Sequence, residues 1–166
     1  MNDHLTSKVS EYREYIKNHI ANVQASWKIL QSQFPQDCFV SDAELKQRIT
    51  NRVQNHDASK FFDDEFNGYR KFFYPSYKGE KNYDDFQLAW KTHYSRNDHH
   101  WEHWLDENGN PRDRGNARIE TLVEMVCDWM AMGMQFGNTA GDYYLKNKNT
   151  IKLLQEDRAF VEHLLI

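Results

Sequence analysis

Apolar residues recur every three or four positions over most of the chain, the spacing that places them on one face of an α-helix. The pattern runs from Val9 to Phe34, ends before Pro35, and returns at 45–56, 63–74, 84–94, 98–105, 117–136, 139–147 and 150–165. No segment alternates apolar and polar residues as a half-buried strand does. We therefore predict an all-α fold, a single domain over residues 1–166 built as a bundle of about six or seven helices.

Local signals predict where several of these elements begin and end. Ser41-Asp42-Ala43-Glu44 resembles a capping box in which Ser41 caps the second helix. The helix at 63–74 is expected to turn Phe66, Tyr69 and Phe73 inward. Asn108-Gly109-Asn110-Pro111 predicts a turn. The charged residues Arg112 to Arg118 extend that turn as a solvated loop or as a lid over a pocket.

The composition narrows the classes of function. A net charge of -4 over 166 residues argues against nonspecific binding to nucleic acid, which needs an excess of Lys and Arg. The two cysteines, Cys38 and Cys127, have no paired spacing, so neither a disulfide framework nor a cysteine zinc site is expected. The chain shows no apolar signal segment and no run long enough to span a membrane. We expect a cytoplasmic protein.

Residues that bind metals recur on the inward faces of separate predicted helices. His56-Asp57 ends one helix, where an imidazole and a carboxylate can reach one ion such as Mn, Fe, Co, Ni or Zn. Asp128 stands in the most apolar helix, and a buried carboxylate is costly unless it is paired or coordinated. His19 and His93 lie beside or within two further apolar stripes. Four separate elements therefore predict one buried metal site.

The order of these residues resembles the H…HD…D signature of HD-domain phosphohydrolases, carried here by His19, His56-Asp57 and Asp128. Members of that superfamily hold a metal inside a helical bundle. His56-Asp57-x-x-Lys60, His93 and His99-His100 are further similar to the HD-GYP branch and other binuclear HD proteins. Ser59 stands where that branch has Gly, and the chain has no G-Y-P sequence. The chain also resembles a family of small bacterial and phage proteins with an H-D-x-S-K motif and an aromatic HHW segment, which has no assigned activity.

The resemblance implies one or two divalent transition-metal ions. The ligands of the first would be His19, His56, Asp57 and Asp128. Those of the second would be His93, His99 and His100, with Asp57 bridging the two ions. Three histidines among five positions cannot all ligate one ion from one short helix, so at least one of His99, His100 and His103 is expected to act outside the ligand set.

Other polar residues are candidates for catalysis and substrate binding. Lys60 would hold a substrate phosphate beside the catalytic Asp57. Glu124, one turn before Asp128, would orient a histidine or act on a proton, and its alternative is a salt bridge to Arg118 or Lys60. Arg96 and Asn97 are candidate substrate contacts.

We therefore expect a metal-dependent phosphohydrolase that acts on a nucleotide or similar small phosphate ester through metal-activated water. Two alternatives stay open. The same ligands would serve a mixed-valence di-iron oxygenase, and a protein with a structural metal would bind or sequester a nucleotide without turnover. A small-molecule partner is expected in each case, and a homodimer is left open.

Overall fold

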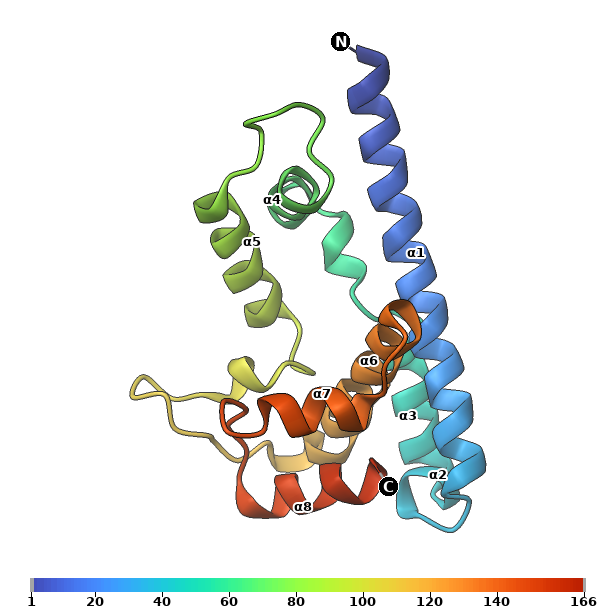
Figure 1. The fold of residues 1–166 in the computed structure, drawn as a ribbon. Helices are drawn as coiled ribbons and strands as arrows, with labels where there is room; N and C mark the ends of the chain where they lie inside the picture. The colour runs from blue at the N-terminus through green and yellow to red at the C-terminus, as the bar shows by residue number, and fades with distance from the viewer. Residues whose placement is uncertain (1, 166) are drawn as a thin grey trace. The chain divides into compact units, whose positions relative to one another are not determined.

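The computed structural model describes residues 2–165, and the elements in that range are helical apart from one isolated bridge between Leu105 and Pro111. The helices are α1 (Asn2–Gln33), α2 (Cys38–Ser41), α3 (Ala43–Gln54), α4 (Asp63–Phe73), α5 (Tyr83–Arg96), α6 (Arg118–Phe136), α7 (Ala140–Asn147) and α8 (Gln155–Leu164) (Figure 1). Three short 3-10 helices complete the set, η1 (Ala58–Phe61), η2 (Trp101–Trp104) and η3 (Gly115–Ala117). The predicted all-α fold is confirmed. No helix in the described range is both long and apolar enough to cross a membrane.

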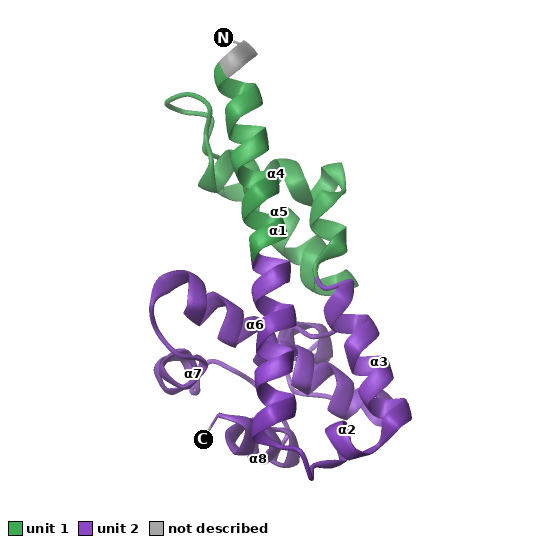
Figure 2. Ribbon diagram, turned by 90° about the vertical axis from the view of Figure 1, so that its right-hand side faces the viewer, with its two compact units in different colours: residues 1–18, 57–97 green, residues 19–56, 98–166 purple. Residues whose placement is uncertain are grey.

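The chain divides into two compact units (Figure 2). Unit 1 contains the chain up to Asn18 together with Asp57–Asn97, which includes α4 and α5. Unit 2 contains His19–His56 together with the chain from Asp98 onward, which includes α3 and α6 to α8. A single domain over residues 1–166 stays a prediction.

The core of unit 2 forms around α6, which packs against α3, α7 and α8. Ten residues of α6 are buried, most of them apolar, as expected of a helix surrounded by others. Val23, Trp27 and Leu30 of α1 and Leu45, Ile49 and Val53 of α3 join the same core. The Trp27 indole donates to the Thr50 hydroxyl across 3.0 Å, which satisfies the polar atom of a nearly buried ring.

Unit 1 is built on the close packing of α4 against α5. Gly68 makes this approach possible, because a Cβ at that position would lie 2.6 Å from both the Ala89 Cβ and the Asp85 carbonyl oxygen. Phe66 and Tyr69 are buried as predicted, but Phe73 is 56% exposed. The prediction was wrong there because Phe73 is the last residue of α4, where its ring packs against Phe72 and Phe86 at the edge of the unit.

The N-terminus of α3 differs from the prediction in its cap residue. Asp42, not Ser41, is the cap, and its carboxylate accepts from the amides of Glu44 and Leu45 at 2.9 and 3.0 Å. Ser41 instead ends α2, where its hydroxyl donates to the Asp37 carbonyl. A short preceding helix that the apolar pattern does not reveal therefore moves the cap by one residue.

The last helix begins at Gln155, not at Thr150. Ile151 and Leu153 are buried in the segment before it, while Lys152 between them is exposed and donates to the Gly109 carbonyl. This alternation buries apolar side chains from non-helical backbone. Similarly, only Trp101–Trp104 of the predicted helix at 98–105 is helical, as a 3-10 turn.

The charged loop before α6 is not fully solvated. Arg114 is 3% exposed, and its guanidinium donates to Asp157 at 3.2 Å and to the Thr121 hydroxyl at 3.1 Å. Arg118 donates to the same carboxylate at 2.6 Å. Unlike a swinging lid, the loop is therefore attached to α8 by a buried ion pair.

The loop between α4 and α5 depends on Glu80, which predicts an acid-sensitive contribution to stability. Arg70 donates twice to Glu80, at 2.9 and 2.6 Å, and Ser76 donates from its amide and hydroxyl. The Arg70 hydrogen bonds lower the pKa of Glu80 to about 2. Because this folded-state pKa lies below the usual value of 4.5, the stabilisation is complete above the usual value and is lost as the pH falls toward 2.

Glu80→Gln is therefore expected to reduce the free energy of unfolding at pH 7 by about 1.5–3 kcal/mol, the range for hydrogen bonds to charged groups. The difference from wild type should shrink when urea titrations are repeated between pH 4.5 and 2.5. Asp84→Asn on the exposed first turn of α5 is the control. A loss that stays constant down to pH 2.5 would contradict the assignment.

Candidate metal centre

Three side chains of unit 2 direct nitrogen and oxygen atoms to one place. His19 Nε2 lies 3.0 Å from Asp128 Oδ1 and 3.3 Å from His56 Nε2, and His56 Nε2 lies 3.8 Å from the same carboxylate oxygen. Metal–ligand bonds of about 2.1 Å place neighbouring ligand atoms about 3.0 Å apart in an octahedron and about 3.4 Å apart in a tetrahedron. The spacing of the three atoms therefore fits one coordination sphere.

The three residues come from two helices, α1 and α6, and from the turn after α3, and the apolar faces of these helices bring them inward. His19 follows Ile16 and precedes Val23 on the buried side of α1. His56 lies two residues beyond the end of α3, where its amide bonds to the Val53 carbonyl and its ring is buried. Asp128 is on α6. The predicted convergence of metal-binding side chains is thus present within unit 2 for this group.

Burial makes the charge on Asp128 depend on its neighbours. Its side chain is 13% exposed, and burial by itself would raise the pKa of the carboxyl group. The neighbouring His19 and His56 outweigh that effect and hold the pKa of Asp128 well below its ordinary range. The group is therefore a carboxylate at neutral pH, the form that binds a cation.

Glu124, one turn before Asp128, contacts two of the histidines from the other side. Its Oε1 lies 2.9 Å from His56 Nδ1 and 3.3 Å from His99 Nδ1. Burial would raise the pKa of Glu124, but the charge of His99 and the hydrogen bond from His56 hold it below its ordinary range. A carboxylate only accepts hydrogen bonds, so His56 donates from Nδ1. This leaves the Nε2 lone pair of His56 available for a metal.

Within unit 2, the salt bridge considered between Glu124 and Arg118 is not formed, and a pairing of Glu124 with Lys60 of unit 1 stays a prediction. Arg52 of α3 is its cationic partner, with Nε donating to Oε2 at 2.8 Å. Arg118 pairs with Asp157, and Lys60 pairs with Asp57. Arg52 was not a candidate in the sequence analysis, because it is 72 residues from Glu124 and its own helix gives no sign of the pairing.

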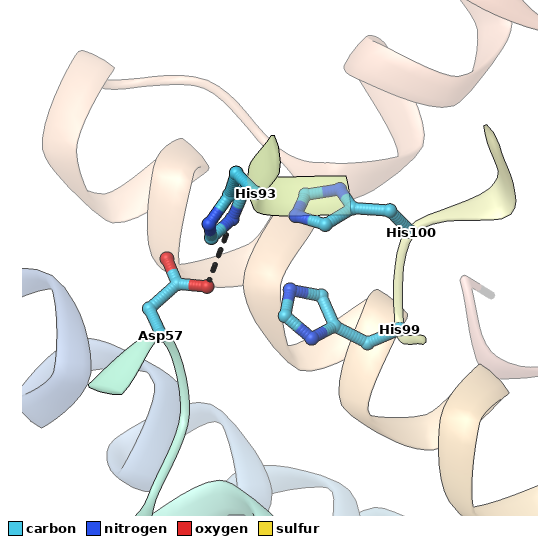
Figure 3. A group of neighbouring side chains, drawn as sticks. All are labelled: Asp57, His93, His99 and His100. Atoms are coloured by element: carbon cyan, nitrogen blue, oxygen red, sulfur yellow. Dashed lines mark ion pairs between the residues drawn. The ribbon is translucent and has the colours of Figure 1, made fainter. Parts of the chain in front are cut away.

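Unit 1 contains a second buried group of His and carboxylate residues, centred on His93. His93 Nε2 lies 3.2 Å from Asp57 Oδ1, and Nδ1 lies 2.8 Å from Glu65 Oε2 (Figure 3 draws the Asp57 pair). Burial would lower the pKa of His93, but Asp57 and then Glu65 raise it above its ordinary value. Asp57 has φ 54°, a left-handed conformation that is uncommon outside glycine.

Glu65 was missed by the sequence analysis although it is fully buried. It is the third of three acidic residues in the first turn of α4, a position where carboxylates ordinarily favour the positive end of the helix dipole. The only signal was its place on the same face as Phe66 and Tyr69. That signal is weak, because Glu65 ends a run of three acidic residues.

The three candidate substrate contacts all have partners within unit 1. Lys60 Nζ is 2.7 Å from Asp57 and lies over the Tyr69 ring. Arg96 donates to Asp64 and Glu65. Asn97 donates to the Ser59 hydroxyl at 2.8 Å and to the His93 carbonyl. Their role in binding a substrate stays a prediction.

The ligands expected for a second ion come from both units. Asp57 and His93 belong to unit 1, and His99 and His100 belong to unit 2. The neighbouring rings of His99 and His100 have centroids 4.3 Å apart and are tilted by 40° (Figure 3). The ring of His99 also lies 4.4 Å from that of His56. Within unit 2, His99 thus lies in one group with His56 and Glu124.

Comparison with known proteins matches the chain to a family whose function is unknown. A model described as "Family of unknown function (DUF5662)" matches residues 8–165. Searches of curated proteins and of solved structures found no match.

Proposed function

We propose that this chain, which belongs to the DUF5662 family of unknown function, is a metal-dependent phosphohydrolase that acts on a nucleotide or similar small phosphate ester. The proposal depends on one observation, the convergence of His19, His56 and Asp128 on a volume the size of one ion. The order of these residues along the chain, which resembles that of HD-domain phosphohydrolases, connects such an ion to phosphate ester hydrolysis.

The donor set fits a divalent transition metal. Two imidazoles and one carboxylate suit Mn, Fe, Co, Ni or Zn, and three protein ligands leave positions for water and substrate. Such an ion lowers the pKa of bound water and neutralises developing charge on phosphoryl oxygens. His19, His56 and Asp128 would hold the ion, and Glu124 would orient His56. The second ion, the bridging role of Asp57 and the phosphate contact of Lys60 belong to the same proposal as predictions.

A cytoplasmic location is part of the proposal. Cys38 and Cys127 are both free thiols, the state that a reducing compartment maintains. Cys127 is buried, and burial raises the pKa of its thiol well above the ordinary value, which makes it an unreactive core residue.

The test is metal analysis followed by a substrate screen. Protein purified without chelator is expected to retain about one or two ions per chain and, when loaded with Mn, Co, Ni or Zn, to release phosphate from members of a nucleotide panel. His19→Gln should lower both metal content and turnover by more than about 10-fold. His163→Gln is the matched control, because His163 pairs with Asp37 at the surface of unit 2.

The other outcomes are distinct. Metal-loaded protein that releases no phosphate from any nucleotide would contradict hydrolysis. Two tightly held irons with oxygen consumption would instead support the oxygenase. Stoichiometric nucleotide binding without turnover, unchanged in Asp57→Ala, would support a binding protein. Absence of metal from wild type under every loading condition would contradict the centre itself.

A further inference from the structure

Arg52 holds two carboxylates of unit 2 with one guanidinium. Its Nε donates to Glu124 Oε2 at 2.8 Å, and its NH2 group donates to Asp98 Oδ1. The Arg52 side chain is 25% exposed and that of Glu124 is 5% exposed, so the Glu124 contact is largely shielded from water. Charge-assisted hydrogen bonds of this kind are strong and directional.

The Glu124 contact determines how that carboxylate faces the histidines. Oε2 is engaged by Arg52, and Oε1 is left to accept from His56 Nδ1 and His99 Nδ1. The two oxygens thus have different partners on opposite sides. Rotation of the carboxyl group would break contacts on both sides at once, so the Arg52 hydrogen bond selects the orientation in which Oε1 points to both rings.

The second contact of Arg52, with Asp98, lies next to His99. Asp98 immediately precedes His99 in the chain, and its carbonyl accepts from the Trp104 indole at 2.6 Å. Arg52 therefore contacts both the acceptor shared by the two imidazoles and the side chain of Asp98, the residue that precedes one of them. In the described part of unit 2, no other arginine pairs with Glu124.

We propose that Arg52 is a positioning residue of the metal centre, which sets cation affinity by fixing Glu124 as the common acceptor of His56 and His99. The inference rests on the proposed function, because it assumes that His56 binds the cation. The sequence suggested two roles for Glu124, to orient a histidine or to act on a proton, and this proposal assigns it the first. Carboxylates and their partners behind a metal-bound histidine typically change metal affinity by 10–100-fold when they are removed.

The chain contains a matched control one helical turn away. Arg48 of α3 donates to Glu120 of α6 at 2.5 Å, just as Arg52 donates to Glu124 four residues later on both helices. Both pairs connect the same two helices, but within the described residues Glu120 makes no hydrogen bond or ion pair with a histidine. A role limited to helix packing would make Arg48 and Arg52 equivalent in a metal-binding assay.

The experiment measures Co²⁺ affinity by chelator competition, together with the visible spectrum of the Co²⁺ protein, in the full chain. We expect Arg52→Gln to weaken Co²⁺ binding by about 10-fold or more and to change the spectrum, and Arg48→Gln to alter affinity by less than about 2-fold. Arg52→Lys, which keeps the charge but cannot reproduce both contacts, should fall between wild type and Arg52→Gln.

A double-mutant cycle separates positioning from general stability. If Arg52 acts through Glu124, Arg52→Gln should cost little further affinity in a chain that already carries Glu124→Gln. Additive losses would overturn the inference, as would an Arg52→Gln protein that binds Co²⁺ like Arg48→Gln, or an Arg52→Lys protein equal to wild type. Failure of wild type to bind Co²⁺ would instead contradict the proposed function.

Discussion

Replacing Asp128 with asparagine is expected to weaken binding of Zn²⁺ or Co²⁺ by more than about 100-fold, beyond the range for partners behind the ligands. Asparagine keeps the shape of the side chain but replaces a carboxylate oxygen with a neutral amide. His19 and His56 would then face the cation without the only charged ligand in their group. Two neutral imidazoles alone hold such an ion poorly, so chelator competition should detect the loss directly.

The same variant tests whether the metal stabilises the fold. A cation that binds only the folded state adds about 2.7 kcal/mol to the free energy of unfolding at 100 times its Kd. Wild-type protein should therefore gain thermal stability on addition of metal, and Asp128→Asn should not. Glu120→Gln, two turns earlier on α6, is the control. If Asp128→Asn keeps wild-type affinity, the centre formed by His19, His56 and Asp128 is wrong.

The second large effect is expected at Asp157, where replacement by alanine should reduce the free energy of unfolding by about 3–5 kcal/mol, the usual cost of breaking a buried ion pair. Asp157 is 1% exposed and accepts from Arg114 and Arg118. Burial lowers the pKa of Arg114 to about 10 despite the opposing effect of Asp157. Without that carboxylate, the Arg114 guanidinium would stay buried against the Thr121 hydroxyl and the Trp104 ring.

Urea denaturation at pH 7 measures this effect as a change in the transition midpoint at constant slope. The double variant Arg114→Met with Asp157→Leu should recover most of the loss, because apolar residues of similar volume often replace a buried pair without cost. Glu156→Ala on the exposed first turn of α8 serves as the surface control. A loss below about 1 kcal/mol for Asp157→Ala would contradict the burial of the pair.

The apolar pattern along the chain was sufficient to predict the helices and several of the side chains that face inward. His56 could be placed because it continues the face of Leu45, Ile49 and Val53. Asp128 could be singled out because a carboxylate in an apolar helix needs a partner. Both conclusions rest on local periodicity, which relates neighbouring residues on one helix. The same rule failed where burial does not follow a helix, as for Ile151 and Leu153.

The sequence by itself thus determined that the fold is helical and that His19, His56 and Asp128 are inward-facing or costly to bury. Only the tertiary structure decided which side chains meet: Arg52 with Glu124, Glu65 with His93, and Arg114 with Asp157. Contacts between helices depend on the register in which distant segments pack. A repeat of three or four residues specifies which side of a helix is buried, but not what lies opposite it.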